Sequence, residues 1–424
     1  MEGFLPSISS QYTVAELLPA GLAIPMLMVS SAFREVCFTC GASYLIWKNP
    51  SMVSVADRRY LRCLRILFQE INSQNVDGSE DWLLFGILNL SLREKYYGAS
   101  NTKCTMHLTA AYQLLRQRQW KWLNIQKSQP KFDKIKFENF INPDSDDLDA
   151  NNFVIFNREL SDLFSSSPKT QIKVTPNERY MIDSFAYNYA AELLVCKDDA
   201  LAKLPSPFDF FDDFREAMSV ALFPLPLDWM NNPILGAARD AYELAAKASY
   251  VSRFTRLEGI MLEKAQELYK QASSSLCSNL PSFIYDSESK ATCTHLRSSL
   301  MVGEIVMRSC HILLRKTLNR SINSDDEVIQ RDVRIVIECL KLIPEYHNIS
   351  CIMPWPVTVA ASAAIHPTDQ AFFQRRTLAI GDQLHTRYAY QMLDLYAKAW
   401  GTGKKKPMGC DVLLDRELLE KVCF

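Results

Sequence analysis

Residues Asp81–Arg118 read DWLLFGILNLSLREKYYGASNTKCTMHLTAAYQLLRQR, and this stretch decides the fold class. Apolar side chains recur in it at three- and four-residue spacing on both sides of a polar turn that begins at Gly98. They are Trp82, Phe85, Leu88 and Leu92 before the turn, and Met106, Leu108, Ala110, Ala111, Leu114 and Leu115 after it. The pattern predicts two amphipathic helices folded back on each other. Because neither can bury its apolar face alone, other helices must cover the pair.

The same helical period continues through most of the chain. Further helices are predicted at 24–47, 54–74, 149–164, 177–196, 233–250, 255–275, 287–318, 324–342, 355–365, 368–400 and 413–422. In the helix at 177–196, Tyr180, Ser184 and Tyr187 share one face. No alternating strand pattern of useful length occurs. We therefore expect an all-α fold, a single large domain of about a dozen helices with little or no sheet.

Two segments interrupt the helical pattern. Residues 120–150 are rich in Lys, Asn and Asp and predict a surface loop, whereas 204–233 carries five prolines and predicts a hinge. The expected organisation is a short lead at 1–12 followed by one helical domain at 13–424.

Composition narrows the class of protein. The chain has 424 residues, of which 48% are hydrophobic and 22% charged, as in ordinary soluble globular proteins. Its net charge of −1 lacks the basic footprint of a nucleic-acid-binding domain. The 12 cysteines show no disulfide-like spacing, and no apolar run is long enough to span a membrane. We expect an intracellular protein that neither binds nucleic acid directly nor enters a membrane.

Three motifs that suggest chemistry are better explained by structure. Cys37 and Cys40 form a CxxC pair, but they sit inside an apolar helix and predict buried thiols. The DDxxE spacing of Asp212–Glu216 is that of a magnesium–diphosphate box, yet the second box that such enzymes need is missing, and acids suit the first turns of a helix. His107 predicts a core histidine. No catalytic residue, metal ligand or cofactor site is assigned.

Several pieces of the chain together resemble the fungal-specific transcription factor domain of the second type, the helical region that follows a zinc cluster in many fungal regulators. The pieces that carry the resemblance are 25–45, 60–67, 81–115, 296–320 and 340–380, including the Leu342-Ile343-Pro344 and Trp355–Ala361 blocks. Two glycines of the family pattern are replaced by Ala110 and Ala361. If these two segments pack together, a pocket is expected at their contact. The six closely spaced cysteines of the family's DNA-binding module are absent from this sequence.

The resemblance implies a regulator of transcription, in the nucleus, that senses an apolar small molecule or contacts a protein. It would act as a homodimer or as a heterodimer with a DNA-binding regulator. Side chains in and near the two signature segments are the candidate ligand-binding residues: Trp82, His107, Trp355, His366 and Arg376. The alternative is a stand-alone enzyme or carrier of fungal secondary metabolism, an isomerase or cyclase acting on an apolar intermediate in the cytoplasm. A purely structural dimerisation scaffold is a third possibility.

Overall fold

The computed structural model describes residues 11–73, 76–98, 101–122, 172–274, 279–401 and 406–424. Within these ranges the backbone is helical or irregular, with no strand, and 14 helices have seven or more residues. The all-α fold in a single domain is thereby confirmed. Residues 1–10 of the predicted lead at 1–12, the predicted helix at 149–164 and most of the predicted loop at 120–150 lie outside the described residues.

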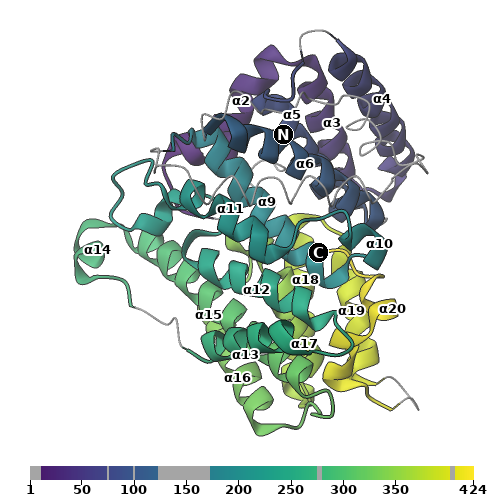
Figure 1. Ribbon diagram of the computed structural model, residues 1–424, viewed down its shortest axis with the longest axis vertical. Helices are drawn as coiled ribbons and strands as arrows, with labels where there is room; N and C mark the ends of the chain where they lie inside the picture. The colour runs from purple at the N-terminus through teal and green to yellow at the C-terminus, as the bar shows by residue number, and fades with distance from the viewer. Residues whose placement is uncertain (1–10, 74–75, 99–100, 123–171, 275–278, 402–405) are drawn as a thin grey trace.

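The helices form two groups along the chain (Figure 1). The first group is α2 (Pro19–Val29), α3 (Ser31–Leu45), α4 (Val53–Asn72), α5 (Asp81–Tyr97) and α6 (Asn101–Trp122). The second, from the middle of the chain onward, is α10 (Asp198–Leu201), α11 (Pro207–Ser219), α12 (Arg239–Ser252), α13 (Gly259–Ser273), α14 (Ser282–Ser287), α15 (Lys290–Leu318), α16 (Glu327–Leu342), α17 (Pro354–Ala363), α18 (Pro367–Leu384), α19 (Tyr388–Trp400) and α20 (Arg416–Leu419). Short 3-10 segments are η1 (Ala15–Leu17), η2 (Pro50–Met52), η4 (Asp228–Asn231), η5 (Gly236–Ala238), η6 (Asn348–Ile352) and η7 (Gly409–Leu414).

Helix α9 (Pro176–Val195) joins the two groups. It packs against α5 and α6 on one side and against α12 on the other, and Figure 1 shows it between them. A capping box begins it, with Thr175 and Glu178 each accepting a hydrogen bond from the other's backbone amide. Every residue from Arg179 to Val195 is buried. A helix that is buried on all faces is a central element, so α9 lies in the core that both groups share.

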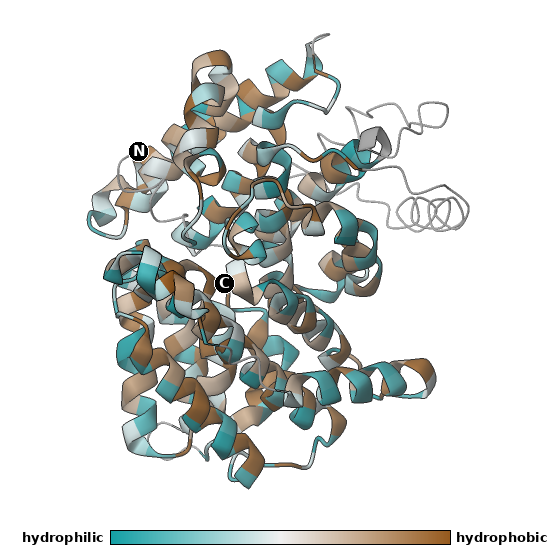
Figure 2. Cartoon of the chain, turned by 90° about the vertical axis from the view of Figure 1, so that its left-hand side faces the viewer, coloured by the Kyte–Doolittle hydropathy of each residue, from teal (hydrophilic) through white to brown (hydrophobic). Residues whose placement is uncertain are grey.

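The predicted pair at Asp81–Arg118 is present as α5 and α6, which pack on each other. However, α5 is not an amphipathic surface helix. Between Leu83 and Tyr96 only Leu92 is less than fully buried, because α3, α6 and α9 cover it from different sides. The charged residues Arg93, Glu94 and Lys95 are therefore buried too. Along the more peripheral helices, polar and apolar residues alternate in bands (Figure 2).

Two predicted helices are each divided into two. The helix expected at 24–47 is α2 and α3, and between them the Ser30 hydroxyl oxygen accepts a hydrogen bond from the Phe33 amide at 3.1 Å, which begins a new helix. The helix expected at 368–400 is α18 and α19. His385 ends α18 in the left-handed region, with φ 52°. The following Thr386 donates its hydroxyl proton to the Lys95 carbonyl at 2.9 Å and so fixes this break against α5.

The proline-rich segment after α11 is held by polar side chains of α9. Arg179 donates to the carbonyl of Ala217 at 2.8 Å and to that of Val220. One carboxylate oxygen of Asp183 accepts from the amides of Ile234 and Leu235 at 2.7 and 2.9 Å. These bonds attach the segment to the centre of the molecule. The hinge at 204–233 stays a prediction.

The condition for a pocket between the Ala110 and Ala361 segments, that the two pack together, is not met. Both alanines are fully buried, but α6 packs on α5 and α9, whereas α17 packs on α15, α16, α18 and α19. Each alanine serves a different contact, and a pocket between them does not form. Among the described residues no helix is both long enough and apolar enough to cross a membrane.

Candidate functional site: a tyrosine-lined cavity

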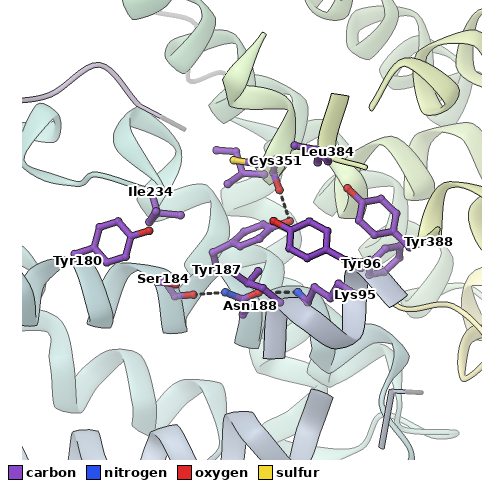
Figure 3. Close-up of a pocket in the computed structure, with 13 residues that line it drawn as sticks. Lys95, Tyr96, Tyr180, Ser184, Tyr187, Asn188, Ile234, Cys351, Leu384 and Tyr388 are labelled. Carbon is purple, nitrogen blue, oxygen red and sulfur yellow. Dashed lines mark hydrogen bonds between the residues drawn. The ribbon is translucent and has the colours of Figure 1, made fainter. Parts of the chain in front are cut away.

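A cavity of about 50 Å³ lies where the two helix groups meet (Figure 3). Helices α5 and α9 supply one side of its wall, and η6, the end of α18 and the start of α19 supply the other. The lining residues are Leu92, Lys95, Tyr96, Tyr180, Ser184, Tyr187, Asn188, Ile234, Cys351, Ile352, Leu384, Tyr388 and Phe424. All are buried except Leu92 and Cys351, which are partly exposed.

The spacing along α9 explains the largest part of the wall. Tyr180, Ser184 and Tyr187 follow one another at four and three residues, so they fall on one face of the helix, and that face lines the cavity. Sequence periodicity had placed these three side chains together, although not in a cavity. Asn188, one residue further, extends the same face.

Lys95 supplies the charge of the cavity. Its side chain enters from α5, only 4% of the residue is exposed, and Nζ donates to the Asn188 amide oxygen at 2.7 Å. The ring of Tyr187 lies 5.5 Å from the ammonium group. The Asn188 amide nitrogen in turn donates to the Ser184 carbonyl at 2.8 Å, which fixes the orientation of the asparagine. No carboxylate in the described part of the chain forms an ion pair with Lys95. Its nearest hydrogen-bond partner is thus an amide oxygen, and the charge of Glu192 acts on it without an ion pair.

The tyrosines differ in what their hydroxyl groups bind. Tyr187 donates to the Cys351 carbonyl at 2.8 Å. Tyr388, 4% exposed, has a buried hydroxyl group with no hydrogen-bond partner in the described residues. Burial raises the pKa of both phenols, so both remain protonated donors at neutral pH. The cavity therefore offers apolar ring faces, one cation and at least one unused donor.

None of the five residues singled out from the sequence lines this cavity, and they are spread over α5, α6, α17 and α18. Trp82, in the first turn of α5, is partly buried against the main core. His107, on α6, is buried beside Tyr60, with 3.3 Å between the phenolic oxygen and Nε2. Burial, and then the nearby charges of Arg93 and Lys103, lower the pKa of His107 to about 3. It is a neutral core histidine at physiological pH.

The other three lie in the second helix group. Trp355 is completely buried in α17, and its indole nitrogen donates to the Ser249 hydroxyl at 3.1 Å. His366 is exposed at the start of α18. Arg376 is buried and donates to the carbonyls of Ile343 and Pro344 at 3.1 and 3.2 Å, and burial lowers its pKa to about 10. The assignment of these five residues to ligand binding stays a prediction.

Neither Lys95 nor Tyr388 was predicted from the sequence as a site residue. Lys95 stands in a run of three charged residues, Arg93 to Lys95, within an otherwise apolar helix, and such a run normally marks a solvated face. The one signal that this run is buried was the apolar character of every other side of α5. Tyr388 gives no local signal, because its place in the cavity wall depends on the break at His385.

The DDxxE stretch on α11 is used in ion pairs. Arg116 donates to Asp213 at 2.6 Å, and Arg215 donates to Asp212 at 2.7 Å and to Glu243 at 3.2 Å. Across the part of the chain that the structure describes, no group of three or more His, Cys, Asp or Glu side chains is arranged to hold a metal ion.

A second hollow, of about 400 Å³, lies on the surface along α18. It is larger, but most of its walls are exposed side chains, including Tyr346 and Leu378. Arg375 and Glu345 already pair with each other there at 2.9 Å. The interior cavity, with its fixed walls and unused donor, is therefore the better candidate for a specific site.

Part of the second helix group is similar to a known protein family. Residues 209–403 match the family described as the fungal specific transcription factor domain. This part of the chain is therefore similar to the domain that the sequence suggested, and the similarity supports a regulatory role. The match covers α12 to α19 with most of α11 and includes the Trp355–Ala361 block, whereas α2 to α6 and α9 lie outside it. No curated protein and no solved structure matches the chain.

Proposed function

We propose that the chain is a regulator of transcription that responds to a small molecule bound in the tyrosine-lined cavity. The observation that carries the proposal is the position of the cavity. Lys95 and Tyr187 come from helices outside the matched domain, whereas Cys351 and Tyr388 come from inside it. A ligand that contacts both helix groups can bind one arrangement of the two groups more tightly than another. Such a difference in affinity is the thermodynamic requirement for a ligand switch.

Such a regulator requires a way to reach DNA. We propose that it reaches DNA in the nucleus through a dimer partner. The partner is either a DNA-binding regulator or another copy of the chain bound to such a regulator.

The regulatory role is tested by tethering. The full chain is fused to an unrelated DNA-binding module, and transcription of a reporter carrying the matching site is measured in a fungal host. We expect reporter output to differ from that of the DNA-binding module alone. Ser184→Val, which adds bulk inside the cavity, should change that output further. Ser43→Val, at an equally buried serine on α3 outside the cavity, should not. Output that equals the module alone for every variant would contradict the proposal.

Native mass spectrometry of protein purified from its own host distinguishes this regulator from the alternative, an enzyme or carrier of secondary metabolism. A small molecule that co-purifies with the wild type and is lost in Ser184→Val supports sensing at the cavity. Recovery of two related compounds, interconverted when one is added back to the purified protein, would instead support the enzyme or carrier of secondary metabolism.

A further inference from the structure

We propose that the cavity is built for a small organic acid, with the carboxylate held by Lys95 and the Tyr388 hydroxyl as a second donor to the ligand. The inference rests on the proposed function only in placing a ligand in this cavity, and it adds the chemical class. Three independent features of the site lead to it: its charge, its hydrogen-bonding capacity and its size.

The side chains that line the site carry a net positive charge. Among the side chains of the 13 lining residues, Lys95 is cationic and none is acidic. The charge of Glu192, one helical turn beyond Asn188, acts on Lys95 from outside the cavity lining, and its Oε1 accepts a hydrogen bond from Thr105 at 2.7 Å. Burying an ammonium group without an ion-pair partner costs several kcal/mol. A bound carboxylate would supply that partner.

The hydrogen-bonding capacity of the site is an excess of donors. Lys95 has three N–H groups and uses one of them on Asn188. Tyr388 has a buried hydroxyl group with no partner among the described residues, whereas the neighbouring Tyr187 donates to Cys351. Leaving a buried donor unsatisfied costs about 1–3 kcal/mol. A ligand that relieves both must present acceptors, which a carboxylate does and an amine or a hydrocarbon does not.

The size of the site limits what is enclosed. A cavity of about 50 Å³ is small beside the ~300–1,000 Å³ of sites that hold whole drug-sized ligands. It encloses a group about the size of a carboxylate, so the carbon chain attached to that group must extend towards the partly exposed wall. A longer apolar tail would have to leave past Leu92 and Cys351, the partly exposed residues of the wall. The class that fits is a short monocarboxylate, with or without an apolar extension.

Cys351 provides a direct readout of occupancy. It is the one cysteine of the described residues that is not fully buried. Cys277 lies outside those residues and is replaced by serine in all samples. The rate at which a maleimide labels Cys351 in the full-length protein is then measured with increasing butyrate, at constant ionic strength and pH 7. We expect butyrate to slow labelling in a saturable manner, and 1-butanol, which has a similar shape but no charge, to have at least about tenfold lower affinity.

Two variants test the assigned groups. Lys95→Met keeps the length of the side chain and removes the charge. Because it removes a buried cation without an ion-pair partner, we expect the protein to stay folded, and butyrate affinity to fall by about ten- to a hundredfold. Tyr388→Phe should lower the affinity for butyrate by about three- to tenfold. The matched control is Tyr189→Phe, whose hydroxyl donates to the Pro205 carbonyl outside the cavity and whose loss should leave butyrate affinity unchanged.

The outcomes separate this inference from the proposed function. Equal protection by butyrate in the wild type and in folded Lys95→Met, or protection by butanol alone, would overturn the organic-acid assignment. If the tethered reporter still responds to Ser184→Val in that case, the ligand-responsive regulator survives with a different ligand. Butyrate protection that depends on Lys95, together with a reporter that never responds, would keep the acid site and reject the regulator.

Discussion

Lys95 and His107 show that burial of a basic side chain has two different consequences. The imidazole of His107 is packed against Tyr60 and gives up its charge, since burial lowers its pKa to about 3. The ammonium group of Lys95 keeps an amide oxygen and a ring face as its neighbours and no carboxylate as a partner. A neutral core group needs nothing more, whereas a buried cation without a counter-ion has interaction capacity left for a ligand.

The neutral state of His107 predicts a dependence of stability on acid. In the unfolded chain its pKa is near the ordinary 6.5, whereas in the native state it is about 3. Between these values the unfolded state binds a proton that the native state does not, so the stabilisation present above pH 6.5 is lost as pH falls towards 3. We expect about 2 kcal/mol of this loss between pH 7 and 5. It should be absent in His107→Gln, compared with wild type by urea unfolding at each pH.

The matched control for this prediction is His366→Gln. That side chain is exposed, so solvent surrounds it in both states, and its replacement should leave the acid dependence of the wild type unchanged. An equal acid slope in wild type and His107→Gln would contradict the assignment of His107 as a neutral core group.

At the scale of helices, periodicity predicted which segments are helical but not how many neighbours cover each one. The spacing of Tyr180, Ser184 and Tyr187 correctly placed them on one face. Nothing in that spacing indicates that α5 and α9 are covered on all sides. That burial, and the presence of Lys95 and Tyr388 in one cavity, depend on contacts such as the one between Thr386 and the Lys95 carbonyl, which are 291 residues apart. Local pattern does not encode such contacts, and for this reason the candidate site was missed although most of the fold was predicted.

The hydrogen bonds from α9 to the proline-rich segment predict that this segment loses stability when Arg179 is replaced. Arg179 is buried and donates to Ala217 and Val220 and, at 3.2 Å, to the amide oxygen of Asn232. Arg179→Met leaves these buried acceptors unpaired, so we expect a loss of about 3–5 kcal/mol in the free energy of unfolding. Hydrogen exchange at residues 220–235 should also accelerate more than exchange in α15, because local opening adds to the global loss.

Arg215→Met is the control for this loss. Arg215 lies on the neighbouring α11, and its ion pairs with Asp212 and Glu243 are at the surface. We expect its replacement to cost less than about 1 kcal/mol. A comparably small effect of Arg179→Met would mean that the segment is not held by α9, and the predicted hinge at 204–233 would gain support.

At the scale of the whole molecule, the family match and the folding unit have different boundaries. The match begins at residue 209, yet α12 inside it packs along α9 outside it, and the rings of Tyr242 and Tyr187 meet there at 5.5 Å. Removing α9 would expose an apolar face of α12 that includes Tyr242 and Ala245, both completely buried in the full chain. The matched segment of this chain is thus completed by helices that precede it.

We therefore expect the full chain to unfold in one cooperative transition and the fragment 206–424 not to fold alone. Expressed by itself, the fragment should aggregate or lack the near-UV circular dichroism of fixed aromatic packing, because too little of its apolar surface is covered. Co-expression with a fragment of residues 1–197 should restore a soluble complex, since the cut between them leaves the α9–α12 contact intact. A fragment 206–424 that unfolds cooperatively, with the same midpoint as the full chain, would show instead that the two helix groups fold independently. Butyrate binding would then be lost in that fragment, because Lys95 and the α9 face of the cavity are absent from it.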